Sequence, residues 1–391
     1  MTLERRLRAA GLVAPTYAPG GLGSVLPACA HALGAPLTTS TGLASPDAAA
    51  ALGLPRAARV CVVLVDGLGA RLLESRSGHA PFLRSLLGDR RVAYCGFPST
   101  TAASMGLFGT GTAPGRTAML GYTIRPAGAS GLANMVSWEG MPTPEDVQRE
   151  LTVFEHLAAR DVAVTSVGPA RFAGSGMTRA ALRGSRYVVA ESLDARVDAV
   201  VATLRKPGLA YLYWGEVDKA GHHHGWQSAE WGAALEDIDG ALRRLVRSLP
   251  RGTTVVITAD HGMVDVDPAQ RWDVATEPAL AEGIELVAGE PRAIHLYVSP
   301  GTDPAAVVQR WSDRLGRAVV PVTREEAEAA GWFGDVADHV RAAIGDVVVA
   351  TTGRATVVDS ATQTSASLGL VGVHGSLTPD EVEIPVLTAV V

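Results

Sequence analysis

Two short segments combine carboxylate and imidazole side chains at spacings that suit a metal ion. Asp218 and His222 are four residues apart, which places them on one face of a helical turn. Asp260 and His261 are adjacent, and Gly262 allows the backbone to turn sharply after them. Imidazole nitrogens and carboxylate oxygens are ligands that Zn²⁺ binds well. Taken alone, the first segment also fits a solvated histidine run and the second a capped turn.

A hydroxyl-rich segment, Phe97 to Met105, contains the residue expected to react. We expect a helix to begin near Thr101, with Ser99 as its cap. The positive end of a helix dipole favours an alkoxide, and metal coordination activates a threonine that is otherwise a poor nucleophile. On its own the segment is equally typical of an ordinary helix N-terminus. A further histidine, His374, lies in the glycine-rich turn Gly372 to Gly375.

Three apolar runs predict the strands that would position these side chains. Uninterrupted runs of this kind are typical of parallel strands buried on both faces. Ligands of open α/β sheets gather beyond the carboxyl ends of the strands, so acids that follow the runs would meet at one edge and form a cation site. The runs and the acids after them are 59–65 with Asp66, 209–214 with Asp218, and 253–258 with Asp260.

The chain of 391 residues is longer than a single domain usually grows, which predicts a large α/β domain carrying an inserted lobe. An amphipathic helix over about 229–249 would connect the last two strands of the core. The expected divisions are an irregular N-terminal arm at 1–55, a core of 56–120, 190–280 and 346–391, and a cap or lid inserted as 121–189 and 281–345.

Composition narrows the class of partner and compartment. A net charge of -6 argues against broad nucleic-acid binding, although bound metal ions would still allow a phosphate substrate. The three cysteines form no CxxC pair, which is typical of a reducing compartment. We find no signal peptide pattern and no run of 18 apolar residues that would span a membrane. These features together lead us to expect a cytoplasmic protein.

Together the motifs resemble the alkaline phosphatase superfamily, and most closely its nucleotide pyrophosphatase/phosphodiesterase branch. The resemblance covers about 58–120, 205–265 and 370–391. Five motifs occur in the family's order: a strand ending in Asp66-Gly67, Pro-Ser-x-Thr at Pro98 to Thr101, Asp-x-x-Gly-His-x-x-Gly at Asp218 to Gly225, Asp260-His261-Gly262, and His374-Gly375.

The resemblance implies a three-layer α/β core, in which a mostly parallel central sheet is flanked by helices, and two zinc ions, with Mn²⁺ as an alternative. It also implies hydrolysis of phosphoric ester or anhydride bonds through a phospho-threonine, on a small phosphate-ester substrate such as a nucleotide. In a two-metal site one ion activates the attacking oxygen and the other stabilises the leaving side. The implied ligands are Asp218, His222 and His374 for one ion, and Asp66, Asp260, His261 and the Thr101 oxygen for the other.

Three departures from the family pattern leave the substrate open. Ser104 replaces the usual asparagine three residues after the nucleophile, and the segment 111–118 lacks the family's histidine. The phosphate-binding asparagine of the branch falls at Tyr122, whose hydroxyl could donate instead, and Asn134 is a second candidate for substrate binding.

Charge arithmetic favours a phosphodiester. Two divalent ions would be balanced by three aspartates and an ionised Thr101, and a nearly neutral site suits a singly charged substrate. Arg116 and Arg125 lie near the phosphate loop in sequence and could reverse this preference. The open alternatives are a phosphomonoesterase and a phosphonate hydrolase. Cys95 has the wrong spacing to Pro98 for a sulfatase, and the retained ligands disfavour a non-catalytic binding module.

Overall fold

The computed structural model describes residues 2–89 and 91–391. Within these ranges the core is a seven-stranded sheet in which β1, β5, β6, β7 and β8 run parallel and β17 runs antiparallel to both of its neighbours. This confirms the expected α/β class. In spatial order the strands are β2 (Arg91–Tyr94), β17 (Glu383–Val390), β8 (Thr253–Thr258), β1 (Arg59–Val65), β7 (Gly208–Trp214), β5 (Val164–Gly168) and β6 (Arg186–Val189).

The central strands lie where the apolar runs predicted them. In β1, residues 60–65 are completely buried, because helices cover both faces of the sheet. Val65 pairs with Trp214 and Leu64 pairs with Thr258, so the three strands end at nearly the same level. The acids that follow β1, β7 and β8 are therefore brought to one edge of the sheet.

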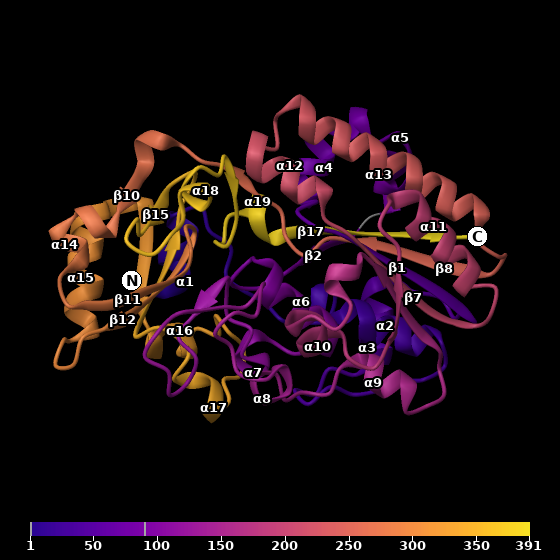
Figure 1. Cartoon of the computed structure of the whole chain (residues 1–391), viewed down its shortest axis with the longest axis horizontal. Helices are drawn as coiled ribbons and strands as arrows, with labels where there is room; N and C mark the ends of the chain where they lie inside the picture. The colour runs from indigo at the N-terminus through magenta and orange to yellow at the C-terminus, as the bar shows by residue number, and fades with distance from the viewer. Residues whose placement is uncertain (1, 90) are drawn as a thin grey trace.

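Helices form a layer on each side of the sheet (Figure 1). The predicted amphipathic helix is α13, which buries Trp231, Leu235, Ile238, Leu242 and Leu245 against the core. One layer holds α4 (Ala70–Ser75), α5 (Pro81–Leu86), α11 (Leu193–Thr203), α12 (Glu216–His224) and α13 (Ala229–Ser248). The other holds α2 (Val25–Ala32), α3 (Ser45–Leu52), α6 (Thr101–Thr110), α9 (Val153–Ala158) and α10 (Gly176–Leu182).

A smaller lobe lies beside the carboxyl edge of the core, at the left of Figure 1. In the described part of the chain its centre is a six-stranded antiparallel sheet with a hydrophobic cluster around Trp311. The strands in order are β13 (Val319–Thr323), β14 (Val347–Thr351), β12 (Ala293–Val298), β11 (Ile284–Glu290), β3 (Thr123–Ile124) and β4 (Ala133–Asn134), covered by α15 (Pro304–Leu315).

Short elements complete the described structure. Two small ladders pair β10 with β15 and β9 with β16. The bounds are β9 (Val264–Asp265), β10 (Arg271–Asp273), β15 (Thr356–Val358), β16 (Gly372–Val373), α1 (Leu3–Ala9), α7 (Pro114–Thr117), α8 (Pro144–Val147), α14 (Pro278–Ala281), α16 (Arg324–Ala329), α17 (Asp338–Arg341), α18 (Ser365–Leu368) and α19 (Pro379–Val382). Among the described residues, no helix has both the length and the apolar character needed to cross a membrane.

The structure divides the chain differently from the expected boundaries. The segment 1–55 is not irregular, because it contains α1, α2 and α3, and α2 is buried on nearly all sides. The expected insertion 121–189 contributes β5 and β6 to the central sheet. Conversely, β14 belongs to the lobe although it falls within 346–391, which we expected in the core. Each difference arises where the sequence lacks the amphipathic period that marks a half-buried element.

Candidate functional site

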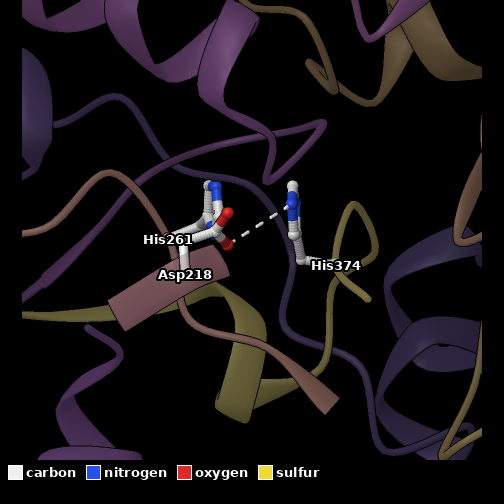
Figure 2. A group of neighbouring side chains, drawn as sticks. All are labelled: Asp218, His261 and His374. Atoms are coloured by element: carbon white, nitrogen blue, oxygen red, sulfur yellow. Dashed lines mark ion pairs between the residues drawn. The ribbon is translucent and has the colours of Figure 1, made fainter. Parts of the chain in front are cut away.

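Three acids meet at the carboxyl edge of the central sheet, as the strand pattern predicts. Asp66 directly follows β1, Asp260 follows β8, and Asp218 lies in the first turn of α12. Their side chains join two histidines in two overlapping groups, in each of which the ligand atoms lie within 4.8 Å of one another. The groups are Asp66, Asp260 and His261, and Asp218, His261 and His374, the second of which is drawn in Figure 2.

Each site histidine is held by a backbone carbonyl at its Nδ1 atom. The Nδ1···O distances are 2.7 Å for His222 to Gly372, 3.0 Å for His261 to Gly262, and 2.9 Å for His374 to Ser99. Because a carbonyl only accepts, Nδ1 carries the proton and donates it. The Nε2 atoms therefore lie on the side of the carboxylates, which is the orientation that metal-binding histidines adopt.

His261 stands between the two groups. Its Nε2 atom lies 3.4 Å from Asp66 Oδ1 and 3.5 Å from Asp260 Oδ2. Its ring stacks on that of His374 at a centroid distance of 3.6 Å. His374 Nε2 is 4.0 Å from Asp218 Oδ1, the pair joined by the dashed line in Figure 2. One side chain thus bridges the two ligand sets that the resemblance keeps apart.

His222 lies next to Asp218 but outside the compact groups. Its Nε2 atom is 3.2 Å from Asp218 Oδ2, as the four-residue spacing predicts. Burial lowers the pKa of His222, but the Asp218 carboxylate outweighs burial and raises that pKa to about 9. Burial likewise acts to raise the pKa of Asp218, and His222 more than reverses it.

The carboxylates are only partly satisfied by hydrogen bonds. The Tyr213 hydroxyl donates to Asp66, and the backbone N–H groups of Gly67 and His261 donate to Asp260 Oδ1 at 3.2 Å and 3.1 Å. Among the described residues, the buried atoms Asp66 Oδ1, Asp218 Oδ1 and Asp260 Oδ2 have no hydrogen-bond partner.

Unpaired buried carboxylates are costly, and burial together with repulsion from Asp218 raises the pKa of both Asp66 and Asp260. A divalent cation would pair with the free oxygens and relieve that cost. The residues present therefore fit a metal centre.

Thr101 is the first residue of α6, and its Oγ1 atom lies 3.2 Å from His261 Nε2. The expected cap is wrong, because the N-cap residue is Thr100 and Ser99 is used elsewhere. The Ser99 hydroxyl donates to Ser376 O at 2.6 Å and accepts from Gly375 N at 3.1 Å. Ser99 thereby ties the nucleophile segment to the loop that carries His374.

The residues that depart from the family pattern have different positions. Ser104 is buried and donates to the Asp260 carbonyl at 2.7 Å, so it supports a ligand and does not face the substrate. Tyr122 is 43% exposed and borders the same cavity as His222 and His374. The Asn134 side chain accepts from Val136 N and Ser137 N in a tight turn and lines a neighbouring cavity. The structure thus brings Tyr122 near the site and leaves Asn134 outside it.

The two arginines near the phosphate loop in sequence are engaged by carboxylates of their own. Arg116 pairs with Glu150 at 3.0 Å and with Asp335 at 3.4 Å. Arg125 pairs with Glu285 at 3.2 Å and lies over the Tyr297 ring. Both positive charges are therefore already compensated.

Two residues near the site were missed in the sequence. Tyr213 belongs to β7 and orients Asp66. Glu290 ends β11 of the lobe and lines the cavity beside His374. The signal used for Asp66 was an acid at the end of a predicted strand. The same signal would have identified Glu290 if β11 had been predicted as a strand.

Comparison with known proteins assigns a family to the chain. The sequence model for type I phosphodiesterase / nucleotide pyrophosphatase matches residues 60–377, a range that contains every ligand candidate and Thr101. The chain belongs to the type I phosphodiesterase / nucleotide pyrophosphatase family.

Two human members of the family align over shorter stretches. Ectonucleotide pyrophosphatase/phosphodiesterase family member 7 is 30% identical over 109 residues, which are 26% of this chain and 24% of that protein. Family member 5 is 34% identical over 85 residues, or 20% of this chain and 18% of the relative. The matched stretches thus span no more than about a quarter of either relative.

Solved structures share the fold over most of the chain. Murine ectonucleotide pyrophosphatase/phosphodiesterase 5 superposes with a TM-score of 0.65 at 14% identity, covering 84% of this chain and 87% of that one. Phosphonoacetate hydrolase from Sinorhizobium meliloti, in complex with phosphonoacetate, gives 0.67 at 20% identity, covering 90% and 92%. These superpositions show that the chain shares its fold with both proteins.

Proposed function

We propose that this chain is a metal-dependent hydrolase of phosphodiester or phosphoric anhydride bonds, with Thr101 as the nucleophile. One observation carries the proposal: three buried carboxylate oxygens, which have no hydrogen-bond partner among the described residues, converge on histidine Nε2 atoms next to the Thr101 hydroxyl. Membership of the phosphodiesterase family supports it.

We propose two zinc ions as the metal, with Mn²⁺ as the alternative. Asp66, Asp260, His261 and Thr101 would hold one ion, and Asp218, His222 and His374 the other. When bound, such ions supply positive charge that favours an ionised hydroxyl and balances the phosphoryl oxygens.

The chain's own groups then account for the reaction. The Thr101 oxygen forms a bond to phosphorus while the bond from phosphorus to the leaving oxygen breaks, which gives a phospho-threonine. A water oxygen then bonds to phosphorus while the bond from phosphorus to the Thr101 oxygen breaks, and a proton from that water restores the Thr101 hydroxyl. The first N–H groups of a helix have no partner within the helix, so those of α6, which begins at Thr101, are suited to hold a phosphoryl oxygen. Tyr213 keeps Asp66 oriented throughout.

A relative supports the role given to threonine. The murine ectonucleotide pyrophosphatase/phosphodiesterase 5 in which one threonine is replaced by alanine is inactive and forms a complex with AMP. A nucleotide is accordingly a reasonable first substrate class to test on this chain.

We expect diesters to be preferred over monoesters by about tenfold in kcat/KM, a difference of about 1.4 kcal/mol. The metal charges would be balanced by the three aspartates and the ionised Thr101, and Arg116 and Arg125 are paired elsewhere, so neither arginine favours a dianion. Comparing bis-p-nitrophenyl phosphate with p-nitrophenyl phosphate at one pH and zinc concentration tests this. A preference for the monoester would move the assignment to a phosphatase.

The alternative is a phosphonate hydrolase, since one structural neighbour is bound to phosphonoacetate. Release of inorganic phosphate from phosphonoacetate, measured in the same screen, decides between the two. For location, we propose the cytoplasm, because Cys29, Cys61 and Cys95 are all free thiols buried in the fold. Fractionation of cells that express the chain tests this.

A further inference from the structure

A cavity of about 370 Å³ opens beside the site histidines. His222 and His374 form its inner wall, and Thr100, the neighbour of the nucleophile, also borders it. The outer wall comes from the end of β11 and from the segment around α18. The remaining lining residues are Tyr122, His223, Glu290, Pro291, Thr364, Ala366, Ser367, Leu370 and Val373.

The chemistry of this lining is apolar and hydroxylic. Pro291, Ala366, Leu370 and Val373 offer aliphatic surface, while the threonine, serine and tyrosine side chains offer hydroxyls. Among the described residues that line the cavity there is no lysine or arginine, and Glu290 supplies the carboxyl group. The lining would solvate a neutral group well and an anion poorly.

Glu290 is built into this wall. It is 7% exposed, and its Oε2 atom accepts from Tyr122 N at 2.9 Å. Its Oε1 atom is buried and has no hydrogen-bond partner within residues 2–89 and 91–391. A Cβ atom added at Gly375 would lie 2.6 Å from Glu290 Cγ, so the carboxyl group packs against the loop of His374.

Two arginines of neighbouring segments have partners other than Glu290 and do not neutralise its charge. Arg292 is completely buried and forms two hydrogen bonds with Glu381, at 3.0 Å and 2.6 Å. Arg271 donates to the carbonyl of Leu368, the last residue of α18. Burial raises the pKa of Glu290 to about 8. When protonated it donates a hydrogen bond, and when ionised it repels an anion.

We propose that this cavity holds the ester group next to the cleaved bond and selects an uncharged group over an anionic one. This rests on the proposed function. The favoured substrates are then phosphodiesters of neutral alcohols, nucleosides or phenols. Nucleoside polyphosphates and phosphonocarboxylates, which carry a second anion at that place, are disfavoured.

Two matched substrates test the selection. Both are p-nitrophenyl aryl phosphates, one with a 4-carbamoylphenyl and the other with a 4-carboxyphenyl group, so they differ in one charge and little in shape. At pH 9 with zinc-loaded protein, we expect kcat/KM for the amide to exceed that for the carboxylate by about tenfold or more. Equal values would overturn the inference.

Three variants test whether Glu290 causes the preference for the uncharged substrate. Glu290→Gln keeps the shape and an acceptor for Tyr122 N, and it should bring the two substrates closer together. Glu139→Gln removes the same charge from an exposed position outside the cavity lining and should leave the ratio unchanged. His223→Gln should not remove the discrimination, and if it does, the imidazole and not Glu290 is responsible.

The outcomes separate the two proposals. If neither diester is hydrolysed by the metal-loaded protein, the proposed function fails. If both are hydrolysed equally well, the function stands and the charge selection fails. Should Glu290→Gln not fold, the ratio measured on the wild-type protein still decides.

Discussion

The two adjacent threonines at the start of α6 face different partners. The Thr101 hydroxyl lies 3.2 Å from His261 Nε2, whereas the Thr100 side chain is directed to Glu290 and helps to lower its pKa against the effect of burial. Only Thr101 is therefore positioned among the metal-ligand candidates. This difference gives a direct test of which hydroxyl attacks phosphorus.

We expect Thr101→Ala to lower kcat on bis-p-nitrophenyl phosphate by at least about a thousandfold, since it removes the nucleophile. The melting temperature should change little, because Thr101 is part-exposed and not a core contact. Thr100→Ala, the matched control, should keep activity within about tenfold. If Thr100→Ala were the inactive variant, the nucleophile would be assigned one residue too late.

The three consecutive histidines differ in the same way. His222 contacts both Asp218 and the Gly372 carbonyl, while His223 and His224 are exposed. We expect His222→Ala to lower bound zinc and activity together. His223→Ala should keep the zinc and change mainly KM, because His223 lines the cavity. Zinc content after dialysis, measured together with kinetics, checks both, and equal zinc loss in both variants would contradict the assignment.

Residue types and spacing were sufficient to propose the ligands, because Asp66, Asp218 and Asp260 each follow a recognisable strand. Ser99 could not be assigned correctly, since its partners, Gly375 and Ser376, are distant in sequence. Tyr213 was missed for the same reason, whereas Glu290 was missed because β11 was not recognised as a strand. A contact between distant segments leaves no local period or spacing to read.

At the scale of elements, β12 shows how a buried histidine ties the lobe together. His295 Nδ1 accepts from Gly345 N at 3.0 Å, and its Nε2 donates to the Leu120 carbonyl at 3.2 Å. Burial lowers the pKa of His295 from 6.5 to about 4. A second proton would have to bind at Nδ1, where it would displace the Gly345 hydrogen bond.

We therefore expect the lobe to lose stability in acid. Between pH 6.5 and about 4 the unfolded chain binds a proton at His295 more readily than the folded one, so unfolding is favoured as pH falls. The full loss is roughly 3 kcal/mol. Urea unfolding of the wild-type protein and of His295→Gln across this pH range measures the loss of stability. Glutamine is the suitable replacement because it keeps a donor and an acceptor but does not titrate. If both proteins lose stability equally, His295 is not the cause.

Elements could be predicted where burial imposes a period. The strands β1 and β8 match their apolar runs residue for residue, and α13 has a clear amphipathic face. In contrast, α2 is apolar on nearly all sides, so no period distinguishes it from a loop rich in alanine. The edge strand β6 has mostly part-exposed and exposed residues, which hides its place in the sheet.

At the scale of the whole molecule, the site joins segments from both ends of the chain. The buried Arg292–Glu381 pair links the lobe to α19, and Glu381 also accepts from Ser376 N in the loop that follows His374. The lobe and core could not be separated from the sequence, because the chain crosses between them several times. Metal binding should therefore stabilise the molecule as a unit.

We expect removal of metal with a chelator to lower the melting temperature, and added zinc to restore it. Without a cation, three buried carboxylates repel one another, whereas metal at 100 to 1,000 times its Kd adds about 3–4 kcal/mol of stability. Calorimetry with and without chelator measures the shift. Asp218→Asn should show a smaller shift in melting temperature when chelator is added. If the chelator leaves the wild-type melting temperature unchanged, the protein has no resident metal.

The position of β17 also bears on the order in which the protein is made. Strand β2 emerges early from the ribosome, yet it joins the central sheet through β17, which is synthesised much later. The nucleophile segment follows β2 directly, and Ser99 pairs with Gly375 shortly before β17. A nascent chain therefore has no way to fix Thr101 against its histidines until nearly all of it has been translated. We therefore expect the proposed hydrolytic activity only after synthesis has passed β17.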